Sequence, residues 1–450
     1  MSQQRSGQNH YNVIVIGGGP AGIAAGIAAG RMGARTLVVE KLGCLGGVAA
    51  SGIPLINFFN NQGVQLVRGI AEELVVNLKK VGGTLGHFVP RNGHIHSITF
   101  TDPEWVKLIA EEMLLKEQVD LLYHSFVFGA EVEDNRLVAI QVANKAGAQR
   151  FSADCFIDAS GDGDVAKFAG ARYEKGRPSD GLMQAMSLIF KLSGVDLETA
   201  GKAMVDQPLI ATPFGSDHPQ NIHLEIKLTP WDEIVDRIGL FHDKGHHIWS
   251  GTLRNGELTY VNTVRVAKLD PTDPWQLTQA EIQGRAQIRR VLEFMKEYIP
   301  GMKDSYLGNI AQQIGIRETR RIMGEYVLTG DDVITGRKFE DSIAKFGYCI
   351  DIHDPEGKGW QARQIEAKDG FYEIPYRCVV PEQIDGLLVA GRCISTTHEA
   401  LASTRIMACC MALGQAAGTA AALASANHIQ PRAVDYRQLR SELLRNGAEI

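Results

Sequence analysis

A glycine-rich turn between a β-branched run and an alanine-rich run constrains the fold of this chain more than any other feature. Residues 11–16 read YNVIVI, residues 17–22 read GGGPAG and residues 23–32 read IAAGIAAGRM. A short β-branched run predicts a strand buried on both faces, and the alanine-rich run predicts a helix. A second strand-like run, TLVVE, follows at residues 36–40. Strand, turn, helix and strand in this order predict the unit from which parallel α/β sheets are built.

The spacing Gly17-x-Gly19-x-x-Gly22 matches that of turns that bind the diphosphate of a dinucleotide. The glycines allow a tight turn and a close approach of the backbone to the phosphates. Free N–H groups and the positive end of the helix dipole then stabilise the negative charge. Glu40 ends the second strand eighteen residues after Gly22. Its carboxylate can accept hydrogen bonds from both hydroxyls of an adenosine ribose, so we predict a dinucleotide site here.

Later segments continue this sheet. A helix is expected at residues 103–116, with Asp102 as its N-cap. The further strands are expected at residues 120–123, in three antiparallel runs within 126–153, at 155–158 and at 386–390. The almost uncharged run 406–426 is long enough to span a membrane, but its content of Ala, Gly, Gln415 and Thr419 indicates a buried helix instead, so no membrane span is predicted.

The pattern of expected secondary structure changes between residues 172 and 375. This region has a hairpin signal at Asn255-Gly256. It also has a helical run at 278–298 that opens with the capping-box pattern Thr278-x-x-Glu281. We therefore predict an α/β chain with two domains: a nucleotide-binding domain with a parallel sheet and a β-meander, formed by residues 1–171 and 376–450, and an inserted α+β substrate domain, residues 172–375.

Composition excludes several classes of protein. The chain has 450 residues, of which 22% are charged, and a formal net charge of −6. An acidic balance disfavours nucleic acid as a partner. Seven cysteines without a CxxC pattern indicate reduced thiols and no iron–sulfur cluster or structural zinc. The N-terminal residues are polar and contain no apolar signal-peptide core, so we expect a cytoplasmic protein.

Three blocks of sequence resemble a known family. They are EKLGCLGG at residues 40–47, IDASGDGDVA at 157–166 and LLVAGRCI at 387–394, and the last continues to Arg405 and to GQAAG at 414–418. They are similar to the FAD-dependent oxidoreductases whose flavin domain is shared with the flavoprotein subunits of fumarate reductase, succinate dehydrogenase and heterodisulfide reductase. The resemblance implies FAD as the cofactor and a Rossmann-like FAD-binding domain.

The same resemblance implies where FAD would lie. The Gly46-Gly47 loop would follow the ribitol and flavin, Phe126 or Val127 would meet the adenine through the backbone, and the helix after Arg405 would point its N-terminus at the flavin N1–C2=O edge. Many relatives carry Asp where this chain has Arg392, which could reach the diphosphate instead. The residues expected to contact FAD are Gly17, Gly19, Pro20, Ala21, Gly22, Glu40, Lys41, Cys44, Gly46, Gly47, Phe126, Val127, Ser160, Gly161, Gly391, Arg392, Leu413 and Gly414.

The cysteine pattern limits the redox chemistry. Disulfide reductases with this flavin domain place two cysteines five residues apart beside the flavin, but Cys44 is followed at that distance by Ala49. A dithiol relay is therefore excluded at this site. Cys44 is interpreted as a packing group, with covalent attachment of the flavin as the alternative. No second glycine-rich strand–turn–helix is present that would bind NAD(P)H, so an external electron acceptor or donor is expected.

Two residues near the C-terminal helix are the candidates for catalysis. His398 could move a proton near neutral pH, and Arg405 could hold a carboxylate or a developing oxyanion. The alternative is that His398 caps a helix and Arg405 binds the flavin phosphate or an Asp. Alternation would place Arg317 and Arg321 on one face of a strand, and a salt-bridge network is favoured there over a substrate clamp. His94-x-His96 and His246-His247 lack further ligands at suitable spacing, so no metal site is predicted.

The sequence thus predicts an FAD-dependent oxidoreductase that transfers a hydride between flavin N5 and a small-molecule substrate. Oxidation of a C–OH, C–N or C–C bond is slightly favoured over reduction of a double bond. The alternative is an electron-relay subunit that acts with a partner protein. Substrate identity and oligomeric state, including a homo-oligomer, stay open.

Overall fold

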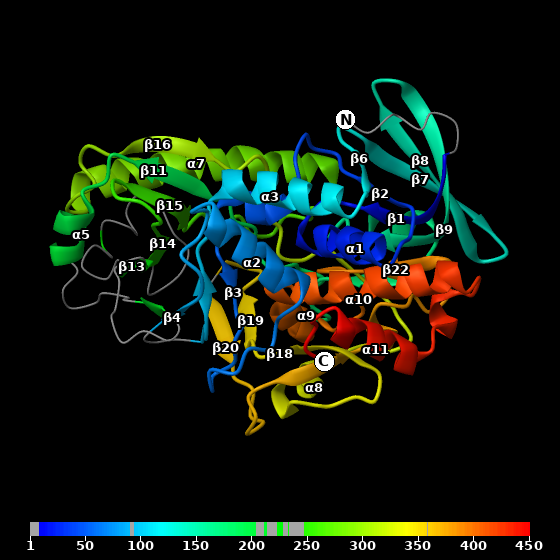
Figure 1. Ribbon diagram of the computed structural model, residues 1–450. Coiled ribbons are helices and arrows are strands. Elements are labelled where there is room, and N and C mark those ends of the chain that lie inside the picture. The colour runs from blue at the N-terminus through cyan, green and yellow to red at the C-terminus, as the bar shows by residue number, and fades with distance from the viewer. Residues whose placement is uncertain are drawn as a thin grey trace.

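The computed structural model describes residues 9–90, 94–203, 211–213, 223–227, 233, 247–357 and 359–450. His246, considered above for a metal site, lies outside these residues. The predicted α/β class is confirmed: a largely parallel central sheet is covered by helices, and a second, antiparallel sheet lies beside it (Figure 1).

The central sheet has seven strands. The β-branched run forms β1 (His10–Ile16), which pairs in parallel with β2 (Thr36–Val39) on one side and with β9 (Gly147–Asp158) on the other. Every side chain of β2 is buried, as its apolar composition requires. The other strands are β6 (Asp120–Leu122) beside β2, β8 (Arg136–Asn144) beside β9, β7 (Phe126–Glu133) at the edge, and β22 (Leu387–Val389).

Strand β9 connects the two parts of this sheet. Two separate strands were predicted at its position, one closing the meander and one at residues 155–158, but they form a single strand of twelve residues. Its first half pairs antiparallel with β8, and its second half pairs in parallel with β22. The meander and the C-terminal strand therefore share one side of β9, and residues 158–164 emerge at the carboxyl end of the sheet.

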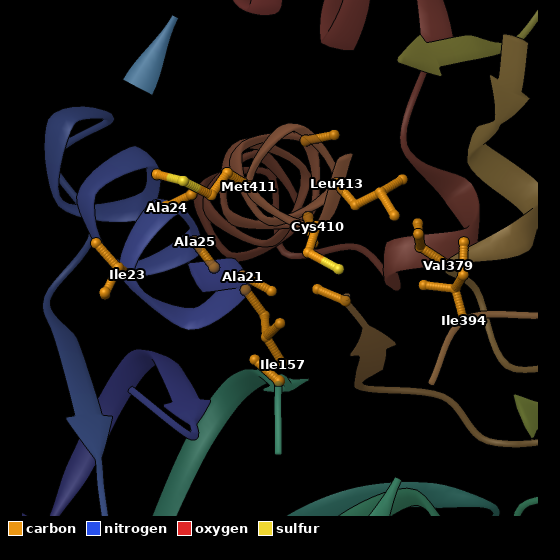
Figure 2. Close-up of a cluster of buried hydrophobic side chains, with 14 of the residues drawn as sticks. Ala21, Ile23, Ala24, Ala25, Ile157, Val379, Ile394, Cys410, Met411 and Leu413 are labelled. Atoms are coloured by element: carbon orange, nitrogen blue, oxygen red, sulfur yellow. The ribbon is translucent and has the colours of Figure 1, made fainter. Parts of the chain in front are cut away.

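Two alanine-rich helices pack closely against each other on this sheet. Helix α1 (Pro20–Arg31) follows the glycine turn, and α10 (Met407–Ala426) is the predicted C-terminal helix. Figure 2 shows Ala21 and Ala25 of α1 at the crossing with α10, where small side chains let the two backbones approach. Helix α10 is long and apolar enough to cross a membrane, but 94% of its most apolar window is buried inside the protein, as predicted from its small and polar residues.

A second hydrophobic cluster lies under the long helix α7 (Pro274–Tyr298), which covers an antiparallel sheet (Figure 1). That sheet consists, in spatial order, of β13 (His223–Lys227), β14 (His247–Gly251), β15 (Glu257–Asn262), β11 (Phe190–Ser193) and β16 (Tyr306–Ile310). The predicted turn at Asn255-Gly256 joins β14 and β15. The predicted helix start at Thr278 was wrong: Asp273 caps α7 through its side chain, and the Thr278 hydroxyl donates to the Pro274 carbonyl inside the first turn.

The remaining elements surround these two cores. The strands form a small sheet of β12 (Ala211–Pro213), β4 (Phe88–Pro90), β5 (Ile98–Thr99) and β3 (Leu55–Ile56), and the pairs β10 (Tyr173–Lys175) with β17 (Arg320–Ile322), β18 (Ser342–Phe346) with β21 (Tyr372–Pro375), and β19 (Ile350–His353) with β20 (Trp360–Arg363). The helices are α2 (Ile70–Lys80), α3 (Pro103–Lys116), α4 (Asp164–Phe168), α5 (Leu197–Ala203), α8 (Gly330–Thr335), α9 (His398–Thr404) and α11 (Tyr436–Arg445). Strands β18 and β21 lie inside the predicted insertion 172–375, yet they pack in the first core with α10.

Candidate active site

One cavity of about 510 Å³ connects the carboxyl end of the central sheet with the second sheet. This volume is typical of sites for small molecules and cofactors. At one end the glycine turn, Glu40 and the loop at Ser160 line the cavity. At the other end it is lined by Trp249, Arg317 and β19. We call the first part the nucleotide end and the second part the polar chamber.

The three glycines of the turn have different structural roles. Gly17 has φ of +101°, and a Cβ there would lie 2.5 Å from the Ala159 carbonyl oxygen. A Cβ on Gly22 would lie 1.8 Å from the Gly17 carbonyl oxygen. Both glycines are therefore required by the fold itself. Gly19 has an ordinary φ of −76°, and a Cβ there would meet nothing within 4 Å.

The open space at Gly19 fits a diphosphate. Gly19 lines the cavity and is the N-cap of α1, whose N-terminus has no side-chain cap. The N–H groups of an uncapped helix N-terminus need acceptors, and phosphate oxygens are suitable ones. Pro20 and Ala21 line the cavity next to Gly19. Folding does not require glycine at position 19, whereas close approach of a ligand does.

Glu40 is held at the position expected for a ribose ligand. Its side chain accepts hydrogen bonds from the N–H groups of Gly18 (2.6 Å) and Leu42 (2.8 Å). These bonds fix the carboxylate at the cavity wall beside the glycine turn. Lys41, Phe126 and Val127 also line this end of the cavity, where the adenosine is expected.

The loop after β9 closes the opposite wall. The buried Asp158 carboxylate accepts hydrogen bonds from the N–H groups of Ser160 (3.1 Å) and Ala166 (2.9 Å), which shapes this loop. Burial raises the pKa of Asp158 to about 6. Ser160, Gly161 and Gly391 line the cavity.

Arg392 also lines the nucleotide end of the cavity. It donates to the Asp162 carboxylate (2.7 Å) and to the Thr319 hydroxyl (3.3 Å). The guanidinium is thus held at the wall of the cavity by two neighbours.

The loop after β2 lies against the glycine turn. Gly47 lines the cavity, has φ of +50°, and a Cβ there would lie 2.9 Å from the Gly19 Cα. Gly46 does not line the cavity, and its N–H donates to the Gly18 carbonyl. Cys44 lines the cavity with its Sγ 3.7 Å from Gln312 Oε1.

The N-terminus of α10, for which the resemblance predicts a flavin contact, faces the cavity. Ile406 is its N-cap, no side chain caps the helix, and Arg405, Met407 and Cys410 line the cavity beside it. An uncapped N-terminus of a long helix favours negative charge, which fits the N1–C2=O edge of a reduced flavin.

Besides Gly46, three other predicted FAD contacts lie away from the cavity surface. Gly414 packs on α1, because a Cβ there would lie 2.1 Å from the Ala21 carbonyl oxygen. Leu413 is buried and points toward Val379 and Ile394 (Figure 2). Gly22 supports the turn from inside. These three residues shape the site through packing.

The structure does not bring His398 to the cavity. Its Nδ1 lies 2.9 Å from Glu318, and both side chains are almost fully buried. It lines a separate pocket of about 360 Å³ with Arg177 and Glu399. His398 is not the cap of α9 either, since Thr397 accepts a hydrogen bond from the Ala400 N–H. The geometry therefore gives no support to a role for His398 at the flavin.

The arginines at positions 317, 320 and 321 have different surroundings. Position 317 precedes strand β17, so alternation does not place Arg317 and Arg321 on one face. Arg320 pairs with Asp164 (2.8 Å), and Arg321 pairs with the buried Glu318. Arg317 instead lines the cavity and donates to the Ala185 carbonyl.

The residues of the polar chamber belong to no sequence motif. Asp351 and His353 lie two positions apart on β19, so both side chains face the cavity. Asp351 accepts hydrogen bonds from the Tyr348 hydroxyl (3.0 Å) and from Arg405 (3.2 Å). His353 Nε2 lies 3.4 Å from Asp351 Oδ2.

Burial and neighbouring charges fix the ionisation of this pair. Burial would raise the pKa of Asp351, but attraction to Arg405 and to the protonated form of His353 outweighs it and holds that pKa well below its usual range. Burial, with Arg317 nearby, lowers the pKa of His353 well below its usual value. At neutral pH Asp351 is therefore charged and His353 is neutral. Only their alternation on a strand could have pointed to these two residues in the sequence.

The sheet topology, the uncapped helix and the acid at the end of β2 define a dinucleotide-binding protein of the Rossmann type. Residues 12–443 match the family described as FAD dependent oxidoreductase. Since this match covers nearly the whole chain, the protein belongs to the FAD-dependent oxidoreductase family. It is accordingly an enzyme with FAD as its cofactor, as the sequence predicted.

Curated relatives match short segments. Dihydrolipoyl dehydrogenase of Trypanosoma brucei brucei is 54% identical over 39 residues, which is 9% of this chain and 8% of that protein. Mitochondrial dihydrolipoyl dehydrogenase of Schizosaccharomyces pombe is 48% identical over 46 residues, or 10% of this chain and 9% of that protein. The chain therefore matches less than a tenth of the length of these relatives.

Solved structures match over most of the chain at low identity. A geranylgeranyl bacteriochlorophyll reductase-like protein of Thermoplasma acidophilum covers 98% of this chain and 85% of its own, with 13% identity and a TM-score of 0.46. The match to a flavin-dependent brominase covers 96% of this chain and 82% of the brominase chain, with 14% identity and a TM-score of 0.48. Likenesses at this level do not assign a reaction to this chain.

Proposed function

We propose that this oxidoreductase transfers a hydride between flavin N5 and a small organic substrate inside the cavity. The observation that carries the proposal is the continuity of the cavity. The nucleotide end, with Gly19 and Glu40, opens into the polar chamber, with Asp351, His353 and Arg405. A cofactor seated at the first end would have a chamber with ionisable side chains beside it, which can accept or donate the proton that accompanies hydride transfer.

Bound FAD would supply the two-electron chemistry at N5. The protein would supply the proton acceptor. Oxidation of a C–OH or C–N bond by hydride transfer also releases a proton from the O–H or N–H group. His353 is neutral and faces the cavity, so it can accept this proton. Asp351, at 3.4 Å, would then stabilise the imidazolium that forms.

Replacing His353 tests this role. In His353→Gln we expect flavin reduction by substrate to slow about 10²- to 10⁴-fold, with FAD content unchanged. In the wild type, reduction should slow on acidification only below the usual histidine range, because the pKa of His353 is lowered. The variant should lose this acidic limb. His10→Gln, at an exposed position paired with Asp154, is the matched control. An unchanged pH profile in His353→Gln would remove this residue from the mechanism.

Anaerobic flavin bleaching separates hydride transfer with a small molecule from electron relay to a partner protein. The purified holoenzyme would be mixed with a panel of small alcohols, amines and saturated acids without oxygen. Loss of the oxidised flavin band with one of them supports the proposal. If no small molecule bleaches the flavin and a co-purifying reduced protein does, the relay function replaces it.

A further inference from the structure

The polar chamber contains more positive than negative side chains. Arg265, Arg317 and Arg405 line it, and Asp351 is the carboxylate beside them. The other charged lining residues, such as Glu40 and Arg392, belong to the nucleotide end. Because His353 is neutral, the chamber carries a net positive charge before any ligand binds.

The burial of Arg317 makes this excess of positive charge energetically unfavourable. It is only 8% exposed, and the partner of its side chain is the Ala185 carbonyl. In the part of the chain that the structure describes, no carboxylate lies within 4.0 Å of its guanidinium. Burial, together with Arg265 and Arg405, lowers the pKa of Arg317 well below its usual value. A buried cation next to like charges is unfavourable unless an anion joins it.

The diphosphate of the flavin nucleotide is not expected to provide that anion. The diphosphate is expected at Gly19, whereas the groups that act on Arg317 are Arg265, Arg405, Asp351 and Tyr348. None of these belongs to the glycine turn or to the Glu40 loop. The walls of the chamber also include apolar groups. These are Ile53, Pro54, Ile95, Trp249 and Trp360.

We propose that the polar chamber binds a small organic carboxylate, with Arg317 and Arg405 as its direct ligands and Arg265 adding to the positive field. This inference rests on the proposed function, in which the chamber is the substrate site. A planar carboxylate matches the fork of a guanidinium and can accept two parallel hydrogen bonds. Asp351 orients Arg405 through the 3.2 Å hydrogen bond and leaves Arg317 for the ligand. The apolar walls would hold the carbon body of the acid.

Paired acids and amides test the charge requirement on the holoenzyme. Benzoate and acetate would be titrated against benzamide and acetamide, with inorganic phosphate as a further arm. The readouts are the flavin absorbance spectrum and the melting temperature, and neither needs turnover. We expect the carboxylates to perturb both, and the amides and phosphate to bind at least about tenfold more weakly.

Substitutions test the assigned ligands. Arg317→Gln and Arg405→Gln should each weaken benzoate binding about 30-fold or more, since each removes one partner of a buried charge pair. Arg317→Gln removes a buried cation that has no carboxylate partner among the described residues, so its ligand-free fold should be preserved. Arg289→Gln, on the exposed face of α7, is the matched control and should bind benzoate normally.

The outcomes are distinct from those of the proposed function. Three results would overturn the carboxylate site. Benzamide could bind as tightly as benzoate, inorganic phosphate could bind as tightly as benzoate, or both arginine variants could bind benzoate normally. If neutral alcohols or amines bleach the flavin while carboxylates do not bind, hydride transfer stands and this inference fails. If carboxylates bind through Arg317 but no small molecule bleaches the flavin, the anion site stands and hydride transfer fails.

Discussion

Replacing Gly19 by alanine separates the needs of the cofactor from those of the fold. The added Cβ meets nothing within 4 Å, and φ of −76° suits alanine. Without ligand the variant should lie within about 1 kcal/mol of the wild type, because the gain through the unfolded state opposes the cost of alanine at an N-cap. In a chain of 450 residues this corresponds to roughly 1 °C or less in melting temperature.

With FAD present, the same methyl group should be harmful. It would occupy space that the diphosphate needs at the N-terminus of α1. Losing two charge-assisted hydrogen bonds to N–H groups costs about 3–6 kcal/mol, so Kd for FAD should rise at least ~100-fold. The stabilisation that FAD gives to the folded protein should shrink accordingly.

The assay compares melting curves with and without FAD, together with flavin content after purification. Gly22→Ala is the contrasting variant, because its Cβ would lie 1.8 Å from the Gly17 carbonyl oxygen and should destabilise the ligand-free protein itself. Wild-type FAD affinity in Gly19→Ala would refute the placement of the diphosphate. A ligand-free melting temperature of Gly19→Ala as low as that of Gly22→Ala would refute the claim of open space.

Two further predictions concern the frame of the site. Gly414→Ala should destabilise the protein by about 1–3 kcal/mol in denaturant unfolding. The clash of a Cβ 2.1 Å from the Ala21 carbonyl oxygen outweighs the gain of up to ~1 kcal/mol in helix propensity. An unchanged denaturation midpoint would contradict the close crossing of α1 and α10. Asp158 has a folded-state pKa of about 6, above its unfolded value, so the folded state binds the extra proton and loses stability as pH rises from about 4 to about 6. Asp158→Asn lacks this loss, and its free energy of unfolding relative to the wild type should rise by about 3 kcal/mol between pH 4 and pH 7. If the difference in free energy of unfolding between Asp158→Asn and the wild type does not change with pH, the pKa of Asp158 is not raised in the folded state.

The sequence alone determined the central sheet, the glycine turn and the acid at position 40. These signals are local, because the tight turn, the buried strands and the helix start each depend on consecutive residues. The glycines at 17 and 22 and the residue Glu40 could therefore be assigned to a dinucleotide cradle from their spacing and residue types. The alanine-rich run of α10 could likewise be predicted as a buried helix from its composition.

Only the tertiary structure decided what surrounds the reacting end of the cofactor. Arg265, Arg317, Asp351 and Arg405 come from four separate segments, and no spacing between them signals that they meet. His398 has the residue type of a proton carrier, yet packing directs it to Glu318, eighty positions away in the chain. Burial and the balance of charge arise when distant segments pack together. They set the balance of charge around Arg317 and keep His353 neutral, so local sequence patterns could not reveal the chamber.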